Sequence, residues 1–510
     1  MASPCSRKLH AIVIPFPAQG HITPMIHLAL KLLQVQEGQT GFTHITFINT
    51  QFNHDLILAN GTSQDLFAMP GLKLLSIPDG LPPDHGRLND GRIEQFADAI
   101  DALYEPLLTF IQDLVFQASS NVSEPPITCI ISDSYLYWMS DLADAVRLPW
   151  VAFWTTPAHS ALAYCSISHL LAQGIIPVNG KSNESTQRVV DCIPGVVPLK
   201  ACDLPSFLQS ADGSPDDFFL LWSLKRFRFG VPQRARWHLG NTTHELDQDA
   251  VGAFQESMGR EFWPIGPLLP PPFFSSQMHT ARAMGTSLWT EGLGCKEWLD
   301  KQEDRSVLYI SFGSIVHMAA EQVEAVADGV EASSCPFLWV LRVDVDKATL
   351  AKLDGFKERT KHRGLIVSWA PQLLVLSHQS VAAFLTHCGW NSILEGISGG
   401  IPMLAWPGGF SEQQLNAKYL VDVWRVALGF ERELTEEGLL LVKKEEIERV
   451  VLKVLSDSSD GKALWERALQ LQRTVREAVL LPKGSSQVNF RHFLEAITQH
   501  TIQEASSMAS

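Results

Sequence analysis

Residues 369–413 read WAPQLLVLSHQSVAAFLTHCGWNSILEGISGGIPMLAWPGGFSEQ, and this stretch decides the fold that we expect. Three short apolar runs lie in it or overlap its start, at Leu365–Trp369, Val381–Thr386 and Ile401–Trp406. Each run is too short for a helix and is bounded by Gly, Pro or Ser, which favours buried parallel strands. The stretch therefore predicts successive strand-to-helix switches, the rhythm of an α/β fold.

A predicted helix between the second and third strands offers an anion site. Gly389 supplies the turn, Asn391 or Ser392 caps the helix, and the helix runs to about Ser398. The orphan N–H groups at its start and the helix dipole attract negative charge, and His387 lies just before them. Because residues 369–413 contain no Lys or Arg, amides and hydroxyls would hold the anion.

Side chains around this helix point to a nucleotide-sugar. Trp369 ends a strand, where its ring can stack on a flat base. Glu395 lies one helical turn after Asn391, so it shares that face and can accept from ribose hydroxyls. Glu412 and Gln413 follow the third strand and can bind sugar hydroxyls. Any one of these residues alone is more often structural, but the set in this order indicates a binding site.

The N-terminal half predicts a second parallel sheet with a histidine at its edge. After the first strand comes PAQGHITP, in which Thr23 and Pro24 begin a helix and His21 lies just before it. Another buried strand ends at Asp133. Since ligands collect at the carboxyl ends of parallel strands, His21 and Asp133 can meet if the two strands are neighbours. A neutral histidine oriented by a carboxylate is a candidate general base.

Composition excludes several classes of function. The 510 residues are 45% apolar, which is ordinary for a globular protein. Their formal net charge of −15 makes the protein poorly suited to binding nucleic acid or anionic membranes. No run approaches the roughly 18 apolar residues that a membrane span needs. The eight cysteines are widely spaced and form no CxxC pair, which favours reduced thiols over disulfides or zinc. We therefore expect a cytoplasmic protein.

Together these motifs resemble the plant secondary-product UDP-glycosyltransferases. WAPQ, THCGWNS and LEG match the signature box of that family, and PAQGH, WPIGPL and GSSQVNF match it elsewhere in the expected order. One departure is PGGFSEQ (407–413), which is one residue longer than the usual loop. The resemblance implies the GT-B type of α/β fold, in which two facing Rossmann-like domains with parallel sheets enclose a cleft.

The domain boundaries that we expect follow from this resemblance and from composition. Residues 1–266 form an acceptor-binding domain, and residues 267–293, rich in Pro, Ser, Gly and Thr, form a linker. Residues 294–484 form the UDP-sugar-binding domain. The resemblance implies that residues 485–510 are a helix that returns to the N-terminal domain.

The resemblance also assigns roles to individual residues. His21 is the general base and Asp133 its partner. The donor site comprises Trp369 and Ala370 at the uracil, Gln372 and Glu395 at the ribose, Ser314, His387, Asn391 and Ser392 at the diphosphate, and Thr155, Glu412 and Gln413 at the sugar, with Gly389 and Trp390 completing the box.

Two short stretches match motifs of other enzyme classes, but we expect neither to have that catalytic role. Residues 396–400 fit the G-x-S-x-G of serine hydrolases, but Ser398 closes a predicted helix instead of opening one. Asp344 and Asp346 fit the D-x-D of metal-dependent glycosyltransferases, but they lie far in sequence from the phosphate-binding box, and a solvated turn is favoured. We predict that the enzyme needs neither a metal nor a cofactor.

The leading interpretation is an inverting O-glucosyltransferase that uses UDP-glucose and acts as a monomer. Its small lipophilic acceptor, a phenolic, flavonoid, terpenoid or hormone, would lie among Phe218–Phe229, Phe153, Trp154 and Trp138. Three alternatives remain open: another UDP-hexose as donor, C- or N-glycoside products, and a catalytically weak UDP-sugar binding protein. The sequence does not name the acceptor.

Overall fold

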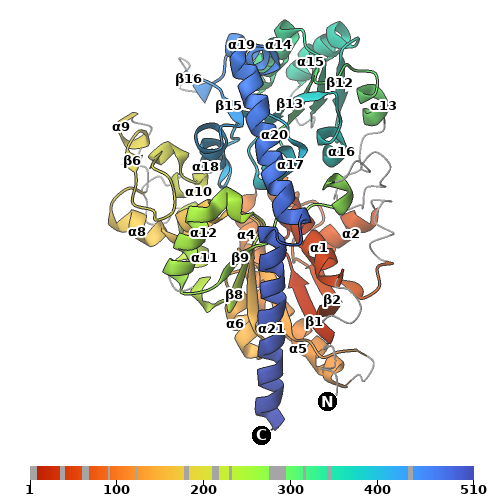
Figure 1. Cartoon of the computed structure of the whole chain (residues 1–510), viewed down its shortest axis with the longest axis vertical. Helices are drawn as coiled ribbons and strands as arrows, with labels where there is room; N and C mark the ends of the chain where they lie inside the picture. Colours follow the sequence, from red (N-terminus) through yellow and green to blue (C-terminus); the bar gives the residue numbers. More distant parts are fainter. Residues whose placement is uncertain are drawn as a thin grey trace.

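The structure is a computed structural model that describes residues 8–34, 41–59, 68–89, 92–120, 124–176, 183–209, 218–228, 232–274, 294–313, 318–341, 347–434 and 440–509. Two large parallel sheets, each flanked by helices, form its two halves (Figure 1). This arrangement confirms the α/β fold class that the strand-to-helix rhythm predicts.

The first sheet belongs to the N-terminal half and contains β1 next to β4. Its strand order over the described residues is β3 (Leu72–Ile77), β2 (Gly41–Thr50), β1 (Lys8–Ile14), β4 (Cys129–Asp133), β5 (Trp150–Trp154), β8 (Trp237–Gly240) and β9 (Phe262–Pro264). Ile14 pairs with Ser132 across β1 and β4. The chain segments that follow these two strands, with His21 and Asp133, therefore start from the same sheet edge.

The second sheet belongs to the C-terminal half and contains the strands of residues 369–413. Its order is β12 (Gly364–Val367), β11 (Phe337–Val340), β10 (Val307–Ser311), β13 (Val381–Thr386), β14 (Met403–Ala405) and β15 (Ala427–Gly429). The described part of the chain also holds two short antiparallel pairs, β6 (Val189–Val190) with β7 (Leu199–Lys200) and β16 (Glu433–Leu434) with β17 (Leu440–Leu441).

Helices cover both faces of each sheet. In the N-terminal half they are α1 (Gln19–Leu33), α2 (Gln51–Ala59), α4 (Ile93–Ala102), α5 (Tyr104–Ser120), α6 (Met139–Ala145), α7 (Ala158–Cys165), α8 (Ile167–Ala172), α9 (Asn183–Thr186), α10 (Ser206–Gln209), α11 (Phe218–Phe227) and α12 (His244–Met258). In the C-terminal half they are α13 (Cys295–Leu299), α14 (Ala320–Ser333), α15 (Lys347–Thr360), α16 (Gln372–Leu376), α17 (Trp390–Gly399), α18 (Gln413–Lys418), α19 (Lys444–Leu455) and α20 (Ser459–Leu480), before α21 (Ser485–Ala509).

Each sheet is buried on both faces, as parallel sheets with helical crossovers require. Along β1, Ile12 packs into the apolar cluster on one face, whereas Ala11 and Val13 pack into the cluster on the other. The alternation follows from the period of two in a strand. The strands therefore carry near-continuous apolar runs and place their polar residues at the carboxyl ends.

Two helix starts differ from the sequence prediction. Helix α1 begins at Gln19, with Ala18 as N-cap, so Pro24 lies inside it and His21 lies in its first turn. Helix α17 begins at Trp390 with Gly389 as N-cap, and no side chain caps it. Asn391 or Ser392 was expected to cap this helix, but both already have helical positions in its first turn. Their side chains are therefore free of the capping role.

The stretch between β3 and β4 forms two successive helices, α4 and α5, with a break between them. Their junction is Leu103, whose N–H bonds the Ile100 carbonyl in a tight final turn. Pro106 in the first turn of α5 fits this break, because proline is tolerated where a helix starts.

The last two helices connect the halves. Figure 1 shows α20 running down from the C-terminal half into α21, which lies along the N-terminal half. Phe493 of α21 is fully buried and its ring stacks on Phe42 and lies edge-on to Trp237. The C-terminal helix thus supplies core side chains to the first sheet.

Of the predicted linker 267–293, residues 267–274 are described and end in the 3-10 turn η4 (Pro271–Phe274). Residues 275–293 lie outside the described part of the chain. Among the described helices, none combines the length and apolar character that crossing a membrane requires.

Candidate active site

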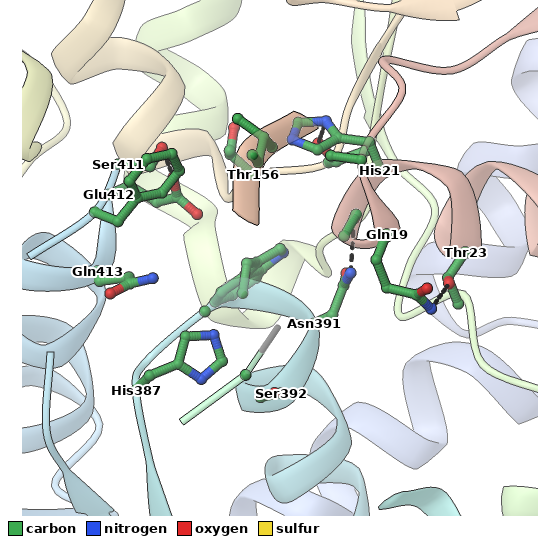
Figure 2. Close-up of a pocket in the computed structure, with 18 of the residues that line it drawn as sticks. Gln19, His21, Thr23, Thr156, His387, Asn391, Ser392, Ser411, Glu412 and Gln413 are labelled. Atoms are coloured by element: carbon green, nitrogen blue, oxygen red, sulfur yellow. Dashed lines mark hydrogen bonds between the residues drawn. The ribbon is translucent and has the colours of Figure 1, made fainter. Parts of the chain in front are cut away.

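A cavity of about 560 Å³ lies between the two halves and is lined by residues of both. From the N-terminal half come the first turn of α1, with His21, and the segment after β5, with Thr155. From the C-terminal half come Trp369, the first turn of α17, and the loop before Gln413. Polar residues of both halves thus face one space (Figure 2).

His21 and Asp133 form a hydrogen-bonded pair at this cavity. His21 Nδ1 lies 2.7 Å from Asp133 Oδ2 and 2.9 Å from Thr155 Oγ1. Asp133 is fully buried, and its other oxygen accepts from the Tyr135 N–H at 2.9 Å, which fixes the carboxylate plane. A carboxylate accepts only, so Nδ1 carries the proton and Nε2 is left with its lone pair.

Opposing forces act on the pKa of His21. Burial lowers the pKa, but the charge of Asp133, its hydrogen bond and the nearby Glu412 raise it more. The net effect raises the pKa above 6.5, the usual value for histidine. The imidazolium is therefore stabilised at this site, which suits a group that receives a proton during a reaction.

The first turn of α17 forms the polar floor of the cavity. The backbone N–H groups at this helix start have no partner within the helix, and Asn391 and Ser392 line the cavity beside them. None of the described lining residues is Lys or Arg. An anion bound here would rest on N–H groups, polar side chains and the helix dipole.

His387 lies between two glycines at this floor. A Cβ built on Gly313 would lie 2.6 Å from its ring, and one on Gly389 would lie 2.3 Å from Nε2. Burial lowers the pKa of His387 to about 4, so the ring is neutral at neutral pH. Within the described part of the chain its buried Nδ1 has no hydrogen-bond partner. The ring is thus held in place by the close approach of the two glycines.

Gln372 connects the residues predicted for the ribose. Its side-chain N–H groups donate to Glu395 Oε2 at 2.5 Å and to Ser392 Oγ at 2.9 Å, and its Oε1 accepts from the Tyr309 hydroxyl at 2.9 Å. Burial raises the pKa of Glu395 to about 7. Trp369 and Ala370 line the same cavity.

Glu412 and Gln413 line the cavity from the start of α18. Ser411, just before them, has the left-handed backbone φ of 56° and donates from its hydroxyl to Glu412. Its Oγ also lies 2.9 Å from the Tyr164 hydroxyl of the N-terminal half. Gln413 Oε1 accepts from the Gly408 N–H at 2.9 Å, closing the loop 407–413. Both predicted sugar-binding residues thus line the cavity, and hydrogen bonds brace the loop that precedes them.

Trp390 plays a different part from the other residues of the box. Its indole N–H donates to the Asn241 carbonyl of the N-terminal half at 2.7 Å, and the side chain is buried against His159 and Trp424. The indole N–H is thus engaged between the halves. Ser314, also predicted at the diphosphate, lies outside the described residues.

An apolar chamber adjoins His21 on the N-terminal side. Among its lining residues, Phe207 and Phe219 stack with centroids 5.1 Å apart, and Phe410 of the C-terminal half lies edge-on to Phe207. Phe218 and Trp222, predicted for the acceptor, line it too. The prediction was wrong for Phe153, Trp154 and Trp138, which are buried in the core. Phe153 and Trp154 lie on β5, which is packed on both faces, and Trp138 packs against Tyr104 of α5. Phe229 lies outside the described residues.

Several lining residues escaped the sequence analysis. Tyr135 lies edge-on to His21 with ring centroids 5.1 Å apart, and Phe16 lies at the same distance on another side. Both follow strand ends, so the rule that placed Asp133 also marks them as candidates. Phe410 and Ser411 fall inside the quoted box but were not assigned a role.

Among the described residues, no group of three or more His, Cys, Asp or Glu side chains is arranged to hold a metal ion. The Asp344 and Asp346 pair lies outside them.

Comparisons with known proteins agree with this geometry. A family model described as "UDP-glucoronosyl and UDP-glucosyl transferase" matches residues 241–454. The chain is 35% identical to (R)-mandelonitrile beta-glucosyltransferase of Prunus dulcis, over 94% of this chain and 95% of that protein. It is also 35% identical to linamarin synthase 1 of Manihot esculenta, over 97% and 98% of the two chains.

Solved structures give the same result. A UDP-glucose: anthocyanidin 3-O-glucosyltransferase in complex with UDP superposes with a TM-score of 0.78 at 27% identity, covering 97% of this chain and all of that one. Phytolacca americana UGT2, complexed with UDP-2fluoro-glucose and pterostilbene, gives 0.74 at 25% identity, with 96% and 99% covered. The fold is therefore of the GT-B type, and the chain belongs to the plant secondary-product UDP-glycosyltransferases.

Proposed function

We propose that this UDP-glycosyltransferase transfers glucose from UDP-glucose to a hydroxyl group of a small, uncharged lipophilic acceptor, with inversion at the anomeric carbon. The observation that carries the proposal is the His21–Asp133 pair, 2.7 Å apart, between the apolar chamber and the polar floor of one cavity. Proteins similar to this chain include glucosyltransferases of small molecules, which supports glucose as the sugar and a small acceptor.

The base acts on the acceptor. His21 Nε2 takes the proton of the acceptor hydroxyl as the oxygen attacks the anomeric carbon of the donor. Asp133 accepts from the Nδ1–H throughout and stabilises the imidazolium that forms. Attack from the side opposite UDP gives a β-glucoside, and the proton then passes from His21 to solvent. General base catalysis of this kind contributes about 10²- to 10⁴-fold.

The leaving group departs toward α17. As the bond between the anomeric carbon and the phosphate oxygen breaks, negative charge grows on UDP. The N–H groups at the start of α17 and the neutral His387 face that charge, and Asn391 and Ser392 add hydrogen-bonding groups. Gln372 and Glu395 would hold the ribose, Trp369 the uracil, and Glu412 and Gln413 the glucose hydroxyls.

The test is a UDP-release assay with UDP-glucose in EDTA, across flavonoids, phenols, terpenoid alcohols and hormones. Mass detection follows the hexose adduct. We expect acceptor-dependent UDP release, one added hexose, an O-linked β-glucoside and full activity without metal. UDP binding without any turnover would favour the binding-protein alternative. An adduct formed only with another UDP-hexose would mean that this sugar nucleotide, and not UDP-glucose, is the donor.

We also propose a cytosolic location, which the reduced cysteines of the described residues support.

A further inference from the structure

Two neighbouring residues of α17 bond backbone carbonyls of the opposite half. Trp390 donates from its indole to the Asn241 carbonyl at 2.7 Å, and Asn391 donates from Nδ2 to the Gly20 carbonyl, also at 2.7 Å. Figure 2 shows the second bond as a dashed line between Asn391 and the helix that carries Gln19 and His21. A carbonyl only accepts, so the amide nitrogen must face Gly20.

The Gly20 carbonyl is an unusual acceptor because it lies in the first turn of a helix. A carbonyl at this position normally accepts the N–H four residues later in the chain. Here that residue is Pro24, which lies inside α1 and has no N–H. The proline ring also crowds the carbonyl four residues before it, which tilts the carbonyl outward. Pro24 thus leaves Gly20 able to accept from outside the helix.

The hydrogen bond from Asn391 to Gly20 connects the segment that carries the base to the donor site. Gly20 directly precedes His21, and Asn391 lies in the first turn of α17, where the leaving group is proposed to depart. A hydrogen bond between them therefore sets the distance from the base to the donor site. Trp390 holds the halves together in the buried interface nearby, whereas Asn391 acts one residue from the base.

We propose that Pro24 is a remote positioning residue for glycosyl transfer. Because Pro24 has no N–H to give the Gly20 carbonyl four residues before it, this carbonyl can accept from Asn391, which holds the first turn of α1, and with it His21, against the donor-binding half. This inference rests on the proposed function of His21. Pro24 itself is not among the described residues that line the cavity, so its effect on catalysis would pass through Gly20 and Asn391.

The decisive variant is Pro24→Ala, which supplies the missing N–H. The new N–H competes with Asn391 for the Gly20 carbonyl and loosens the contact between the halves. We expect kcat to fall about tenfold, because small displacements of a reacting group are costly, while KM for the acceptor changes little. Thermal unfolding shows whether the variant is folded. Pro106→Ala, in the first turn of α5 and exposed, is the matched control and should keep the wild-type kcat.

A double-mutant comparison separates this route from a general loss of structure. Asn391→Ala removes the donor of the bond and is also expected to weaken UDP binding. If both residues act through one bond, adding Pro24→Ala to Asn391→Ala should not lower kcat further. Additive losses in kcat, or a Pro24→Ala enzyme with wild-type kcat, would overturn the proposal.

A readout without turnover keeps the inference apart from the proposed function. Amide hydrogen exchange over Trp390–Leu394 should speed up in Pro24→Ala and in Asn391→Ala, but not in Pro106→Ala. If the wild-type protein transfers no sugar, the proposed function fails, and exchange still decides whether Pro24 and Asn391 are linked. Unchanged exchange in Pro24→Ala would show that they are not.

Discussion

The side-chain amide of Gln372 donates to the Glu395 carboxylate at 2.5 Å, and burial raises the pKa of that carboxyl group to about 7. Glu395 therefore changes charge near neutral pH. A carboxylate accepts hydrogen bonds from ribose hydroxyls better than a carboxylic acid does. We expect the Kd of UDP to fall about tenfold as the pH rises from about 6 to 8.

Glu395→Gln is the control for this prediction, because UDP itself titrates in the same range. In the variant only the titration of UDP should remain. A Kd with the same pH dependence in both proteins would refute the role of Glu395.

Glu395 affects the stability of the protein in the opposite sense. The pKa of its carboxyl group is raised on folding, so its stabilising contribution is present below about pH 4.5 and is lost as the pH rises to about 7.

The pH dependence of turnover should report His21. Only the neutral imidazole accepts a proton, and Asp133 and Glu412 raise the pKa of His21 above 6.5 against the effect of burial. We therefore expect kcat/KM to rise with pH through an acid limb above 6.5. His21→Ala should lose about 10²- to 10⁴-fold in kcat while binding UDP like the wild type, as measured by calorimetry.

Asp133→Asn tests the orientation of the same ring. The amide cannot favour the Nδ1–H tautomer as the carboxylate does, so the plateau of kcat should fall by about 10²-fold or more. Loss of the negative charge should also move the acid limb to lower pH. An acid limb that stays in place would mean that another group titrates in the profile.

The space around His387 predicts a strict requirement for Gly389. Its φ of −66° is open to any residue, so strain is not the obstacle, but a Cβ would lie 2.3 Å from His387 Nε2. We expect Gly389→Ala to displace the ring and weaken UDP binding about tenfold or more. Gly252→Ala in α12, where a Cβ meets nothing within 4 Å, should leave UDP affinity unchanged.

The charge of the cavity predicts which acceptors are refused. Its described lining contains Glu395 and Glu412 but no Lys or Arg. An acceptor carboxylate would lose its hydration without gaining an ion pair. We expect 4-hydroxybenzyl alcohol to exceed 4-hydroxybenzoate in kcat/KM by about tenfold or more at pH 8, by analogy with the cost of burying an unpaired charge. Equal rates would point to a cation outside the described lining.

The sequence predicts most of the fold because its strands are short, apolar and sharply bounded. The run Val381–Thr386 is a strand with those bounds, since Ser380 before it and His387 after it break the apolar pattern. The start of α1 was missed for a physical reason. Proline favours the first helical position, yet Pro24 lies later in α1, and the Gly20 carbonyl, to which it cannot donate an N–H, accepts instead from Asn391, 371 residues away.

Contacts between the two halves could not be predicted from the sequence. The sequence brings Asn391 and Trp390 to one helix start, but the carbonyls of Gly20 and Asn241 that they bond depend on how two domains face each other. The sequence also does not show which aromatic side chains lie in the core and which line the cavity. Trp154 and Trp222 look alike in sequence, yet the first lies on a strand covered on both faces and the second on a helix beside the cavity.

The last helix has a consequence for how the chain is made. Phe493 and Ile497 complete the apolar cluster of the first sheet, in which Phe42 and Trp237 lie. During synthesis these side chains leave the ribosome only after the whole C-terminal half. We therefore expect the N-terminal half to expose this face of its sheet to chaperones until α21 has been synthesised and packs on it.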